Sequence, residues 1–396
     1  MKALFVTHEG FGNSIFRSQV IEHCESMNKN GVEFDVLTYE TFSKSFEGSL
    51  ANVKEYLKWG GVNIFFRKAI NIYLPASLLI NLFILARDIL KNTKTNNYKF
   101  IHARADYTAF LCILLKPLHK LPVLWDCRGD SVDELKFATE KYSSTIRAIL
   151  FLLLLPKQII IRYFASRYSD ACVCVSEALR DLLISINPRL WATVIPCPVP
   201  VDKFYFSMEL RCKVRSFFEV SDEEILFIYS GSMTGYQGII EFISYYERIL
   251  KLSNSRLIIA TVDMDRAKYI FRNVISDRLI ITSVPYDDVN GLYCAADYAL
   301  MTRLPRSLNY VASPTKFGEY CLAGLNVIHN DSIKQVSEIS EFLGNGLPLD
   351  PLPSFKPDLE LRVDIADSAK NIFGRLSLNF IYANIYSKLI KLNGSP

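Results

Sequence analysis

The sequence alternates between short apolar runs and stretches with helical spacing, separated by glycine-rich or polar turns. Apolar runs typical of buried strands lie at residues 3–7, 32–39, 100–104, 121–129 and 171–176, and helical spacing follows the first and the last three. A strand, a glycine turn, a helix and a second strand form a right-handed βαβ unit, which begins a parallel sheet. The order therefore predicts a doubly wound α/β domain in the first half of the chain.

The same alternation restarts near residue 225, after a proline-rich segment. Five strands are predicted there, at the start of "ILFIYSGSMTGYQG" and in "SRLIIATV", "DRLIITSV", "ADYALMTR" and "LNVIHND". Residues 194–206, "VIPCPVPVDKFYF", contain three prolines, which exclude a regular helix and predict an extended connector. We therefore expect two Rossmann-like domains, at 1–200 and 201–370, and the length of 396 residues suits two such domains. Residues 371–396 would form a C-terminal segment that packs back on the first domain. Its helix is predicted at about 370–391. Its predicted apolar face comprises Ile372, Phe373, Leu376, Phe380, Ile381, Ile385, Leu389 and Ile390.

Charge and cysteine content limit the class of protein. Residues 1–200 hold 24 Lys/Arg against 18 Asp/Glu, whereas residues 201–396 hold 21 against 23. The excess in the first half is too small for a nucleic-acid-binding domain and fits an anionic surface or substrate better. Nine scattered cysteines without a CxxC pair indicate reduced thiols, and the first residues resemble a core strand rather than a secretory signal. We expect a protein of the cytoplasm or of the inner face of the cell membrane.

The segment "SPTKFGEYCLAGLNVI", residues 313–328, joins a polar helix start to an apolar remainder. Ser313 suits the N-cap and Pro314 the first helical position, so the next amides would be free to bind phosphate. Glu319 follows Lys316 by three residues on the same helical face, where its carboxylate can accept hydrogen bonds from two vicinal hydroxyls. A capped helix with a surface Lys/Glu pair explains the pattern equally well, although an unpaired Glu in the apolar remainder would be costly.

This segment resembles the nucleotide-sugar signature of GT-B glycosyltransferases, especially those similar to glycosyltransferase family 4. The stretches "EGFGNS", "DCRGD", "VSEALRD", "VIPCPVPVDKF" and "YSGSMTGYQG" agree in order and spacing, so the resemblance covers nearly the whole chain. It implies a GT-B fold, in which two doubly wound domains face a cleft and the C-terminal helix crosses back to the first domain. It also implies an enzyme that moves a sugar from a nucleotide-diphosphate sugar to an acceptor hydroxyl, with no cofactor besides that co-substrate.

The resemblance also assigns roles to individual residues. Glu319 would hold the ribose hydroxyls, the helix tip with Lys316 would bind the diphosphate, and the glycine loops would let the backbone approach the donor. On the first domain, charged residues after the middle strands would face the cleft and act in catalysis. The predicted donor-binding residues are Gly10, Gly12, Gly231, Ser232, Arg303, Ser313, Pro314, Thr315, Lys316 and Glu319, and the predicted catalytic residues are Arg104, Asp126 and Arg128.

Three positions depart from the family pattern. Members usually carry an Arg after the glycine of the "SGSMTGYQG" loop and a Lys before its last glycine, where this chain has Ser232 and Gln237. Val311 stands where the first of two carboxylates is usual. The charge of the diphosphate would then be neutralised by cations nearby in sequence, which are Lys316, Arg303 and Arg306.

The resemblance and the motifs bear on the chemistry as well. No DxD-like pair lies at the end of a predicted strand in a metal-binding context, so we expect a site without metal, in which the helix dipole and cations stabilise the departing diphosphate. Resemblance to family 4 favours retention of the anomeric configuration.

Two uncharged apolar stretches bear on the acceptor. Residues 69–86 carry no charge over 18 positions, and residues 148–156 carry none over nine. Polar residues interrupt the first and the second is too short for a span, so both are predicted as amphipathic or core helices with a basic rim at the surface. The rim would comprise Arg67, Lys68, Arg87, Arg147, Lys157, Arg162 and Arg167. One interpretation is peripheral membrane contact through 69–86 and 148–167, with a lipid-linked saccharide of bacterial surface polysaccharide synthesis as acceptor. The other is ordinary packing of core helices.

Two further functions stay open on the sequence. A nucleotide-sugar epimerase with hydrolase-like chemistry shares the fold but would need clustered carboxylates and histidines, whereas the five histidines are spread along the chain. A non-catalytic partner that has kept the fold would explain Ser232, Gln237 and Val311. The sequence does not indicate the donor base, the donor sugar or the linkage formed.

Overall fold

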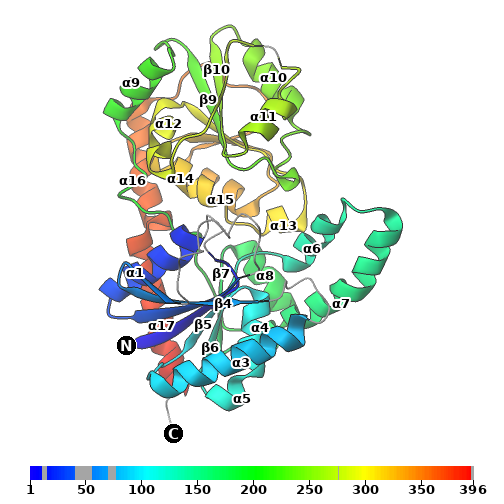
Figure 1. The fold of residues 1–396 in the computed structure, drawn as a ribbon. Helices are drawn as coiled ribbons and strands as arrows, with labels where there is room; N and C mark the ends of the chain where they lie inside the picture. Colours follow the sequence, from blue (N-terminus) through cyan, green and yellow to red (C-terminus); the bar gives the residue numbers. More distant parts are fainter. Residues whose placement is uncertain (11–15, 41–55, 70–76, 275, 394–396) are drawn as a thin grey trace. The chain divides into compact units, whose positions relative to one another are not determined.

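The computed structural model of the chain divides into two compact units (Figure 1). It describes residues 1–10, 16–40, 56–69, 77–274 and 276–393. The first unit comprises Met1–Ile195 together with Leu378–Pro396, and the second comprises Pro196–Ser377. The first transition lies in the proline-rich connector, a few residues before the expected boundary at 200. The second lies within a helix, a few residues after the expected boundary at 370.

The first unit is built on an eight-stranded sheet in the order β3-β4-β2-β1-β5-β6-β7-β8. All neighbours are parallel except β3 and β4, an antiparallel hairpin that the sequence analysis did not predict. Gly60 and Gly61 turn the hairpin at φ of 55° and 83°, a region that favours glycine. The strands are β1 (Lys2–Thr7), β2 (Glu33–Glu40), β3 (Tyr56–Trp59), β4 (Val62–Lys68), β5 (Ile101–Arg104), β6 (Val123–Cys127), β7 (Ala171–Cys174) and β8 (Ala192–Val194).

Helices pack on the two faces of this sheet. On one face, side chains of α1 and α17 form a buried core with alternate residues of the strands, among them Phe5 and Phe34. On the other face, the hydroxyl of Tyr39 on β2 lies 3.4 Å from Asp88 of α3. The helices are α1 (Glu22–Lys29), preceded by a π-helical turn (Phe16–Ile21), α3 (Ser77–Thr95), α4 (Asp106–Leu114), α5 (Lys116–His119), α6 (Ser131–Thr139), α7 (Ser144–Tyr168) and α8 (Glu177–Ile186).

The second unit contains a six-stranded, wholly parallel sheet in the order β11-β10-β9-β12-β13-β14. The five strands predicted after residue 225 are confirmed as β9 to β13. The strands are β9 (Ile225–Ser230), β10 (Ser255–Ala260), β11 (Leu279–Thr282), β12 (Tyr298–Met301), β13 (Asn326–His329) and β14 (Gly346–Leu347).

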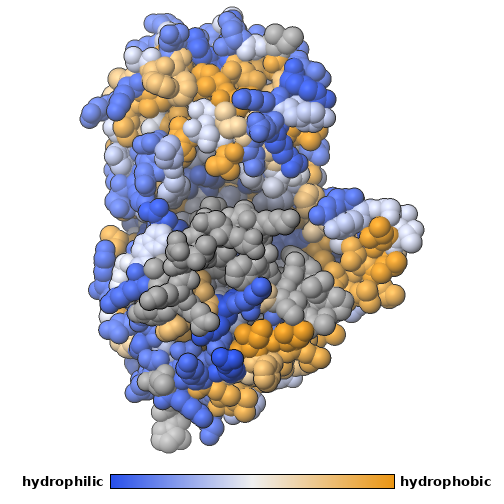
Figure 2. All heavy atoms as spheres, in the orientation of Figure 1, coloured by the Kyte–Doolittle hydropathy of each residue, from blue (hydrophilic) through white to orange (hydrophobic). Residues whose placement is uncertain are grey.

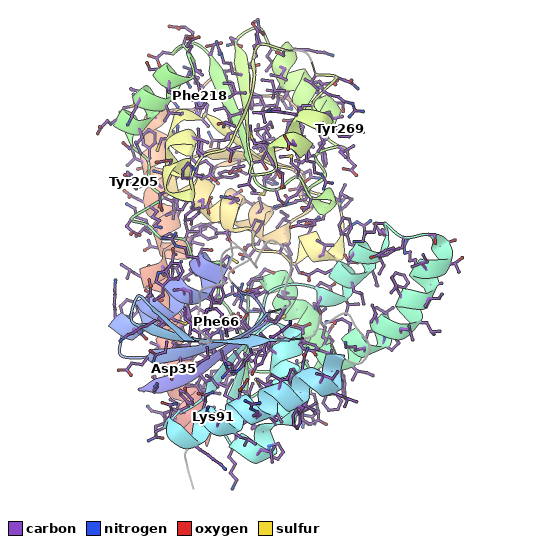
Figure 3. All side chains as sticks on the ribbon, in the orientation of Figure 1. Asp35, Phe66, Lys91, Tyr205, Phe218 and Tyr269 are labelled. Atoms are coloured by element: carbon purple, nitrogen blue, oxygen red, sulfur yellow. The ribbon has the colours of Figure 1, made fainter. Side chains whose placement is uncertain are left out.

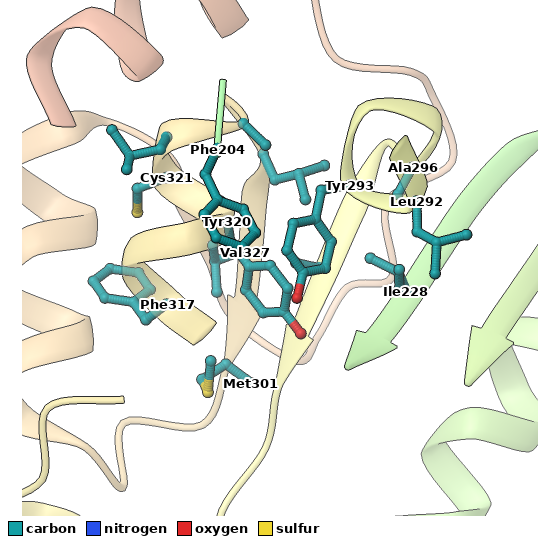
Figure 4. Packing of buried hydrophobic residues seen from close by; sticks show 14 of the residues in the cluster. Phe204, Ile228, Leu292, Tyr293, Ala296, Met301, Phe317, Tyr320, Cys321 and Val327 are labelled. Carbon is teal, nitrogen blue, oxygen red and sulfur yellow. The ribbon is translucent and has the colours of Figure 1, made fainter. Parts of the chain in front are cut away.

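The core of the second unit joins α12 and α14 to the sheet. Figure 4 shows Tyr293 of α12 beside Tyr320 of α14, with Phe317, Met301 and Ile228 around them. The rings of the two tyrosines lie edge to face with centroids 5.0 Å apart, a favourable aromatic geometry. The helices are α9 (Met208–Phe217), α10 (Ile243–Lys251), α11 (Met264–Ile270), α12 (Val289–Ala295), α13 (Ser307–Tyr310), α14 (Thr315–Leu322), α15 (Lys334–Leu343) and α16 (Leu359–Phe373), and 3-10 turns lie at Gly235–Gln237 and Tyr286–Asp288. The last helix, α17 (Arg375–Asn393), belongs to the first unit from Leu378 onward.

The C-terminal region differs from the single helix expected at about 370–391. Two helices, α16 and α17, meet at Gly374, where the chain leaves the helical conformation and pairs with Val199. Part of the predicted apolar face is also wrong, because Leu376 and Phe380 are 64% and 71% exposed. The buried face of α17 instead comprises Leu378, Tyr382, Ile385, Tyr386 and Leu389.

The face of the first sheet that α17 covers contains polar groups as well as apolar ones. The hydroxyl of Tyr386 lies 3.0 Å from His23 Nε2 and 2.9 Å from His102 Nδ1. His102 is buried and stacks on Phe5 with ring centroids 4.3 Å apart. Because an unpaired buried polar group is costly, these hydrogen bonds favour one position of α17 along the sheet.

Buried charge on the strands is paired. Asp35 of β2, labelled in Figure 3, is 2% exposed and accepts hydrogen bonds from Tyr98 Oη at 2.5 Å and Asn63 Nδ2 at 2.8 Å. Lys2 Nζ lies 2.8 Å from the same carboxylate. These contacts compensate the desolvation of Asp35 and connect β1, β2 and β4.

We predict that His119 makes the stability of the first unit depend on pH. Its Nε2 donates to the Cys112 carbonyl oxygen at 2.9 Å, while its Nδ1 accepts from the Leu121 amide at 3.0 Å, so the ring is neutral. Burial lowers the pKa of His119 from its ordinary value of 6.5. The unfolded chain therefore takes up a proton first, and the free energy of unfolding should fall as the pH decreases below about 6.5, by up to about 1.4 kcal/mol per pH unit.

Denaturant unfolding of the wild type and of His119→Gln, at a series of pH values, checks this prediction. The glutamine side chain does not titrate, so the free energy of unfolding of the variant should depend less on pH than that of the wild type. Equal slopes for the two proteins would contradict the prediction.

Candidate functional site

The helix that carries the glycosyltransferase-like signature, α14, begins differently from the prediction. Pro314 occupies the N-cap with φ of −69° and ψ of 121°, and no side chain caps the helix. The hydroxyl of Ser313 instead accepts a hydrogen bond from the Cys197 amide at 3.1 Å. The predicted cap is therefore wrong, because Ser313 binds the connector. Pro314 and Thr315 still form the tip of the helix.

Lys316 and Glu319 meet inside the second unit rather than on its surface. Glu319 is 1% exposed, and its Oε2 accepts hydrogen bonds from Lys316 Nζ and from Tyr293 Oη, both at 2.9 Å. Within the described part of the chain, no group donates to Oε1, and that atom is not sealed from solvent. Burial opposes the charge on the lysine, but the nearby carboxylate raises the pKa of Lys316. Oε1 is therefore an acceptor atom that no described group occupies.

Two tyrosines connect this ion pair to the end of β9. Tyr293 Oη lies 3.0 Å from Ser230 Oγ, and Tyr320 Oη accepts a hydrogen bond from the Ser230 amide at 2.9 Å. In Figure 4 the hydroxyl groups of Tyr293 and Tyr320 point to the same side of the cluster. Burial keeps both phenols neutral by raising the pKa of Tyr293 and of Tyr320. Neither tyrosine was predicted, because each sits in an apolar run that reads only as core.

The loop after β9 lacks cations and instead contains short polar side chains that contact each other. Ser232 Oγ lies 3.0 Å from Thr234 Oγ1 and 3.4 Å from Gln237 Nε2. Tyr229 Oη donates to the Ser232 carbonyl oxygen at 2.8 Å, and Gly238 ends the loop at φ of 74°. A serine and a glutamine therefore bond together where the family usually has an arginine and a lysine, and Gly231 opens this loop.

The loop after β12 contributes the remaining predicted residues of this unit. Val311 is 3% exposed, so the position of the usual first carboxylate belongs to the apolar core here. Arg303 lies two residues after the end of β12, and its backbone amide and carbonyl both bond to Asn330. The structure thus places Arg303, Ser232, Lys316 and Glu319 on segments that leave the carboxyl ends of parallel strands or begin beside them, where α/β sheets bind ligands.

In the first unit, the predicted catalytic residues form a buried network. Arg104 is 2% exposed and donates to Glu9 at 2.6 Å, to Gln19 at 2.7 Å and to Asp126 at 3.3 Å. Asp126 is fully buried and also accepts from Arg128 Nε at 3.0 Å. Burial alone would raise the pKa of the Asp126 carboxyl, but the two arginines and His102 hold it well below its usual range. The structure brings the three residues together, and their catalytic role stays a prediction.

A second buried cluster lies at the same end of the sheet. Arg162 of α7 donates to Asp130 at 2.6 Å and to Asp106 at 3.1 Å, and is 4% exposed. Asp130 in addition accepts hydrogen bonds from two amides at the start of α6. Arg162 therefore holds α4, α6 and α7 together, which does not fit its predicted place in a basic rim at the surface.

Two predicted features of the first unit need separate mention. Gly10 is buried just after β1, whereas Gly12 lies outside the described residues. Among the residues that the structure describes, no group of three or more His, Cys, Asp or Glu side chains is arranged to hold a metal ion.

Comparison with known proteins finds one family model that matches part of the chain. Residues 18–203 match the model of Glycosyltransferase Family 4, which covers most of the first unit. No curated protein matches the chain as a whole sequence. The family match supports a glycosyltransferase, as the sequence resemblance implied, and it rests on a part of the chain outside the signature at 313–328.

Solved structures match nearly the full length. Sucrose-phosphate synthase from Thermosynechococcus elongatus is 13% identical with a TM-score of 0.72, covering 99% of both chains. Anabaena HepE, solved with UDP-glucose, is 14% identical with a TM-score of 0.67, covering 98% of this chain and 100% of that one. A lipopolysaccharide outer core galactosyltransferase, WaaB, is 12% identical with a TM-score of 0.61, covering 98% and 100%. These matches confirm the predicted GT-B fold.

We predict that the buried Glu319 pair contributes much more to stability than a comparable pair at the surface. Glu319→Ala leaves Tyr293 and Lys316 without their shared acceptor and should lower the free energy of unfolding by about 1–3 kcal/mol. The control is Glu338→Ala on α15, which removes an exposed partner 3.6 Å from Lys334 and should cost less than about 0.5 kcal/mol. Denaturant unfolding of the second unit measures both, and equal costs would contradict the prediction.

Proposed function

We propose that this chain transfers a sugar from a nucleotide-diphosphate sugar to an acceptor hydroxyl. The observation that carries the proposal is that the two oxygens of the Glu319 carboxylate differ. Lys316 and Tyr293 both bind Oε2, while Oε1 has no donor among the described residues. A fixed carboxylate oxygen of this kind suits the vicinal hydroxyls of a ribose, which would supply the donors that Oε1 lacks.

Lys316 then lies where a diphosphate would follow the ribose. Its ammonium keeps further N–H donors besides the one bound to Glu319, and it lies 5.8 Å and 5.9 Å from the ring centroids of Tyr286 and Tyr293. The adjacent tip of α14 adds backbone amides and the positive end of the helix dipole. These groups support departure of the diphosphate without a metal ion, and the family resemblance supports retention of anomeric configuration.

A nucleotide-sugar panel tests the donor assignment, and UDP-glucose heads that panel because HepE was solved with it. We expect slow release of free nucleoside diphosphate with one donor, unchanged by EDTA. We also expect Glu319→Gln, which removes the charge but keeps the side-chain size, to lose at least about tenfold of the activity, since hydrogen bonds to charged groups contribute about 1.5–3 kcal/mol. No release with any donor would support a non-catalytic relative, and strict dependence on a divalent ion would overturn the metal-free site.

The acceptor side of the proposal rests on α7, whose exposed face is apolar. Ile149, Leu152 and Ile160 are 54%, 77% and 51% exposed, and they lie on one stripe of the helix together with Ile146, Leu153, Ile159 and Tyr163. The opposite stripe, which includes Leu154 and Arg162, is buried. Within the described part of the chain, α7 is the one helix long and apolar enough to cross a membrane. Its paired Arg162 and its packing on α4 and α6 favour lying on a bilayer over spanning it.

Helix α3 extends the apolar surface and adds positive charge. Leu79 and Phe83 are 74% and 75% exposed, and the same stripe continues through the exposed Arg87, Lys91 and Lys94. Figure 2 shows hydrophobic surface over both α3 and α7. An apolar stripe that becomes basic along one helix suits a bilayer whose headgroups are anionic.

We therefore propose that the enzyme works at the inner face of the cell membrane and that its acceptor is a lipid-linked saccharide of surface polysaccharide synthesis. The match to a lipopolysaccharide galactosyltransferase is compatible with this acceptor class. Part of the predicted region, residues 70–76, lies outside the described residues, so the proposal rests on α3 and α7.

Liposome flotation tests the membrane proposal. The protein should float with anionic vesicles, less at high salt, and little with neutral ones, because both apolar burial and charge contribute. Leu152→Gln combined with Phe83→Gln should reduce flotation severalfold, as should replacement of the basic Arg87 and Lys91 by Gln. The matched control is Leu376→Gln with Phe380→Gln on α17, which removes equally exposed apolar side chains elsewhere. Equal flotation of all variants, or none with the wild type, would contradict the proposal.

A further inference from the structure

Within the described residues, the guanidinium group of Arg303 has no acceptor. Its Nη1 atom is enclosed and has no hydrogen-bond partner there, Nε and Nη2 are unbonded but not sealed from solvent, and no described carboxylate forms an ion pair with the group. A guanidinium group offers five N–H donors and no acceptor, so only an acceptor from outside can satisfy it. An enclosed, unpaired donor destabilises a folded chain unless a ligand supplies the acceptor.

The backbone of Arg303 is rigidly held, which fixes where its side chain can reach. The Arg303 amide donates to Asn330 Oδ1 at 3.1 Å, and Asn330 Nδ2 donates to the Arg303 carbonyl oxygen at 2.7 Å. Two hydrogen bonds to one asparagine clamp the chain as it leaves the sheet after β12. The arginine is therefore positioned by the fold although its charge is not paired by it.

The side chain of Arg303 lies against the loop after β9. Its guanidinium carbon is 5.8 Å from the ring centroid of Tyr236. Burial raises the pKa of Tyr229, whose hydroxyl binds the Ser232 carbonyl oxygen, and the charge of Arg303 opposes that rise. Asn309, 2% exposed, donates to the carbonyl oxygens of Tyr236 and Leu304 at 3.1 Å and 2.8 Å, which ties the two loops together. Arg303 is thus beside the loop in which serine and glutamine stand in place of cations.

We propose that Arg303 supplies, from the loop after β12, the positive charge that Ser232 and Gln237 do not supply from the loop after β9, and that its guanidinium binds the diphosphate of the donor. This inference rests on the proposed function. The planar fork of donors on an arginine matches phosphate oxygens in pairs, and the hydroxyls of Ser232 and Thr234 offer neutral donors on the same loop. Arg303 would then stabilise the leaving diphosphate from the loop after β12, whereas the usual cations lie in the loop after β9.

The test uses inorganic pyrophosphate, which probes the diphosphate site whatever the base of the donor. Calorimetry at constant ionic strength should show pyrophosphate binding weakened at least about tenfold in Arg303→Gln, the loss expected for a hydrogen-bonded charge, and partly restored in Arg303→Lys. The control is Arg266→Gln, which removes an exposed arginine from α11 in the same unit and should bind pyrophosphate as the wild type does.

The melting temperature without ligand separates a binding role from a structural one. Removing an unpaired enclosed donor should leave the melting temperature of Arg303→Gln equal to that of the wild type or raise it, whereas loss of a structural contact would lower it. Binding by Arg303→Gln equal to wild type, or weaker binding accompanied by a lower melting temperature, overturns the inference while the proposed function stands. If the wild type binds neither pyrophosphate nor any nucleotide of the panel, the proposed function itself fails.

Discussion

The candidate site depends on one carboxylate, that of Glu319, which is held almost completely out of water. A charge at that depth is tolerated only with a counter-ion and hydrogen-bond donors, which here are the Lys316 ammonium and the Tyr293 hydroxyl. Tyr293 in turn binds Ser230, the last residue of β9, as does Tyr320. The need to compensate one buried charge therefore fixes the tip of α14 to the carboxyl end of the sheet, and with it the position of the glycine loop that follows.

Buried arginines of both units bond to groups of their own unit, and Arg303 differs from them. Arg104 and Arg162 in the first unit donate hydrogen bonds to carboxylates of the same unit, so they hold strands and helices in place. Arg211, Arg215 and Arg362 in the second unit are also used internally, by Asp297 and by carbonyl oxygens at the end of α12. Arg303 has a positioned backbone, but its guanidinium group donates to no acceptor among the described residues. That contrast, rather than its proximity in sequence, is the reason for proposing that Arg303 binds a ligand.

Much of the architecture could be predicted because parallel strands are continuous apolar runs, and β1, β5, β6, β7 and β9 to β13 stand where such runs occur. The β3–β4 hairpin could not, because its strands mix charged and apolar residues and its turn is two glycines without flanking alternation. In the site, Lys316 and Glu319 were visible through their spacing. Tyr293 was not, since a tyrosine in an apolar helix has no signal until the fold brings it to a carboxylate, and Arg162 looked exposed until its partners from two other helices were known.

The return of α17 to the first unit has a consequence for the order in which the chain can complete its cores. The second unit is one continuous segment, Pro196–Ser377, whereas the first needs Leu378 onward, including Tyr382 and Tyr386, to cover a face of its sheet. During synthesis the whole second unit is therefore translated before α17, the helix that completes the first unit. Until that helix arrives, His23, Phe34 and His102 lack the side chains that bury them. The first half to be translated is the last to be finished.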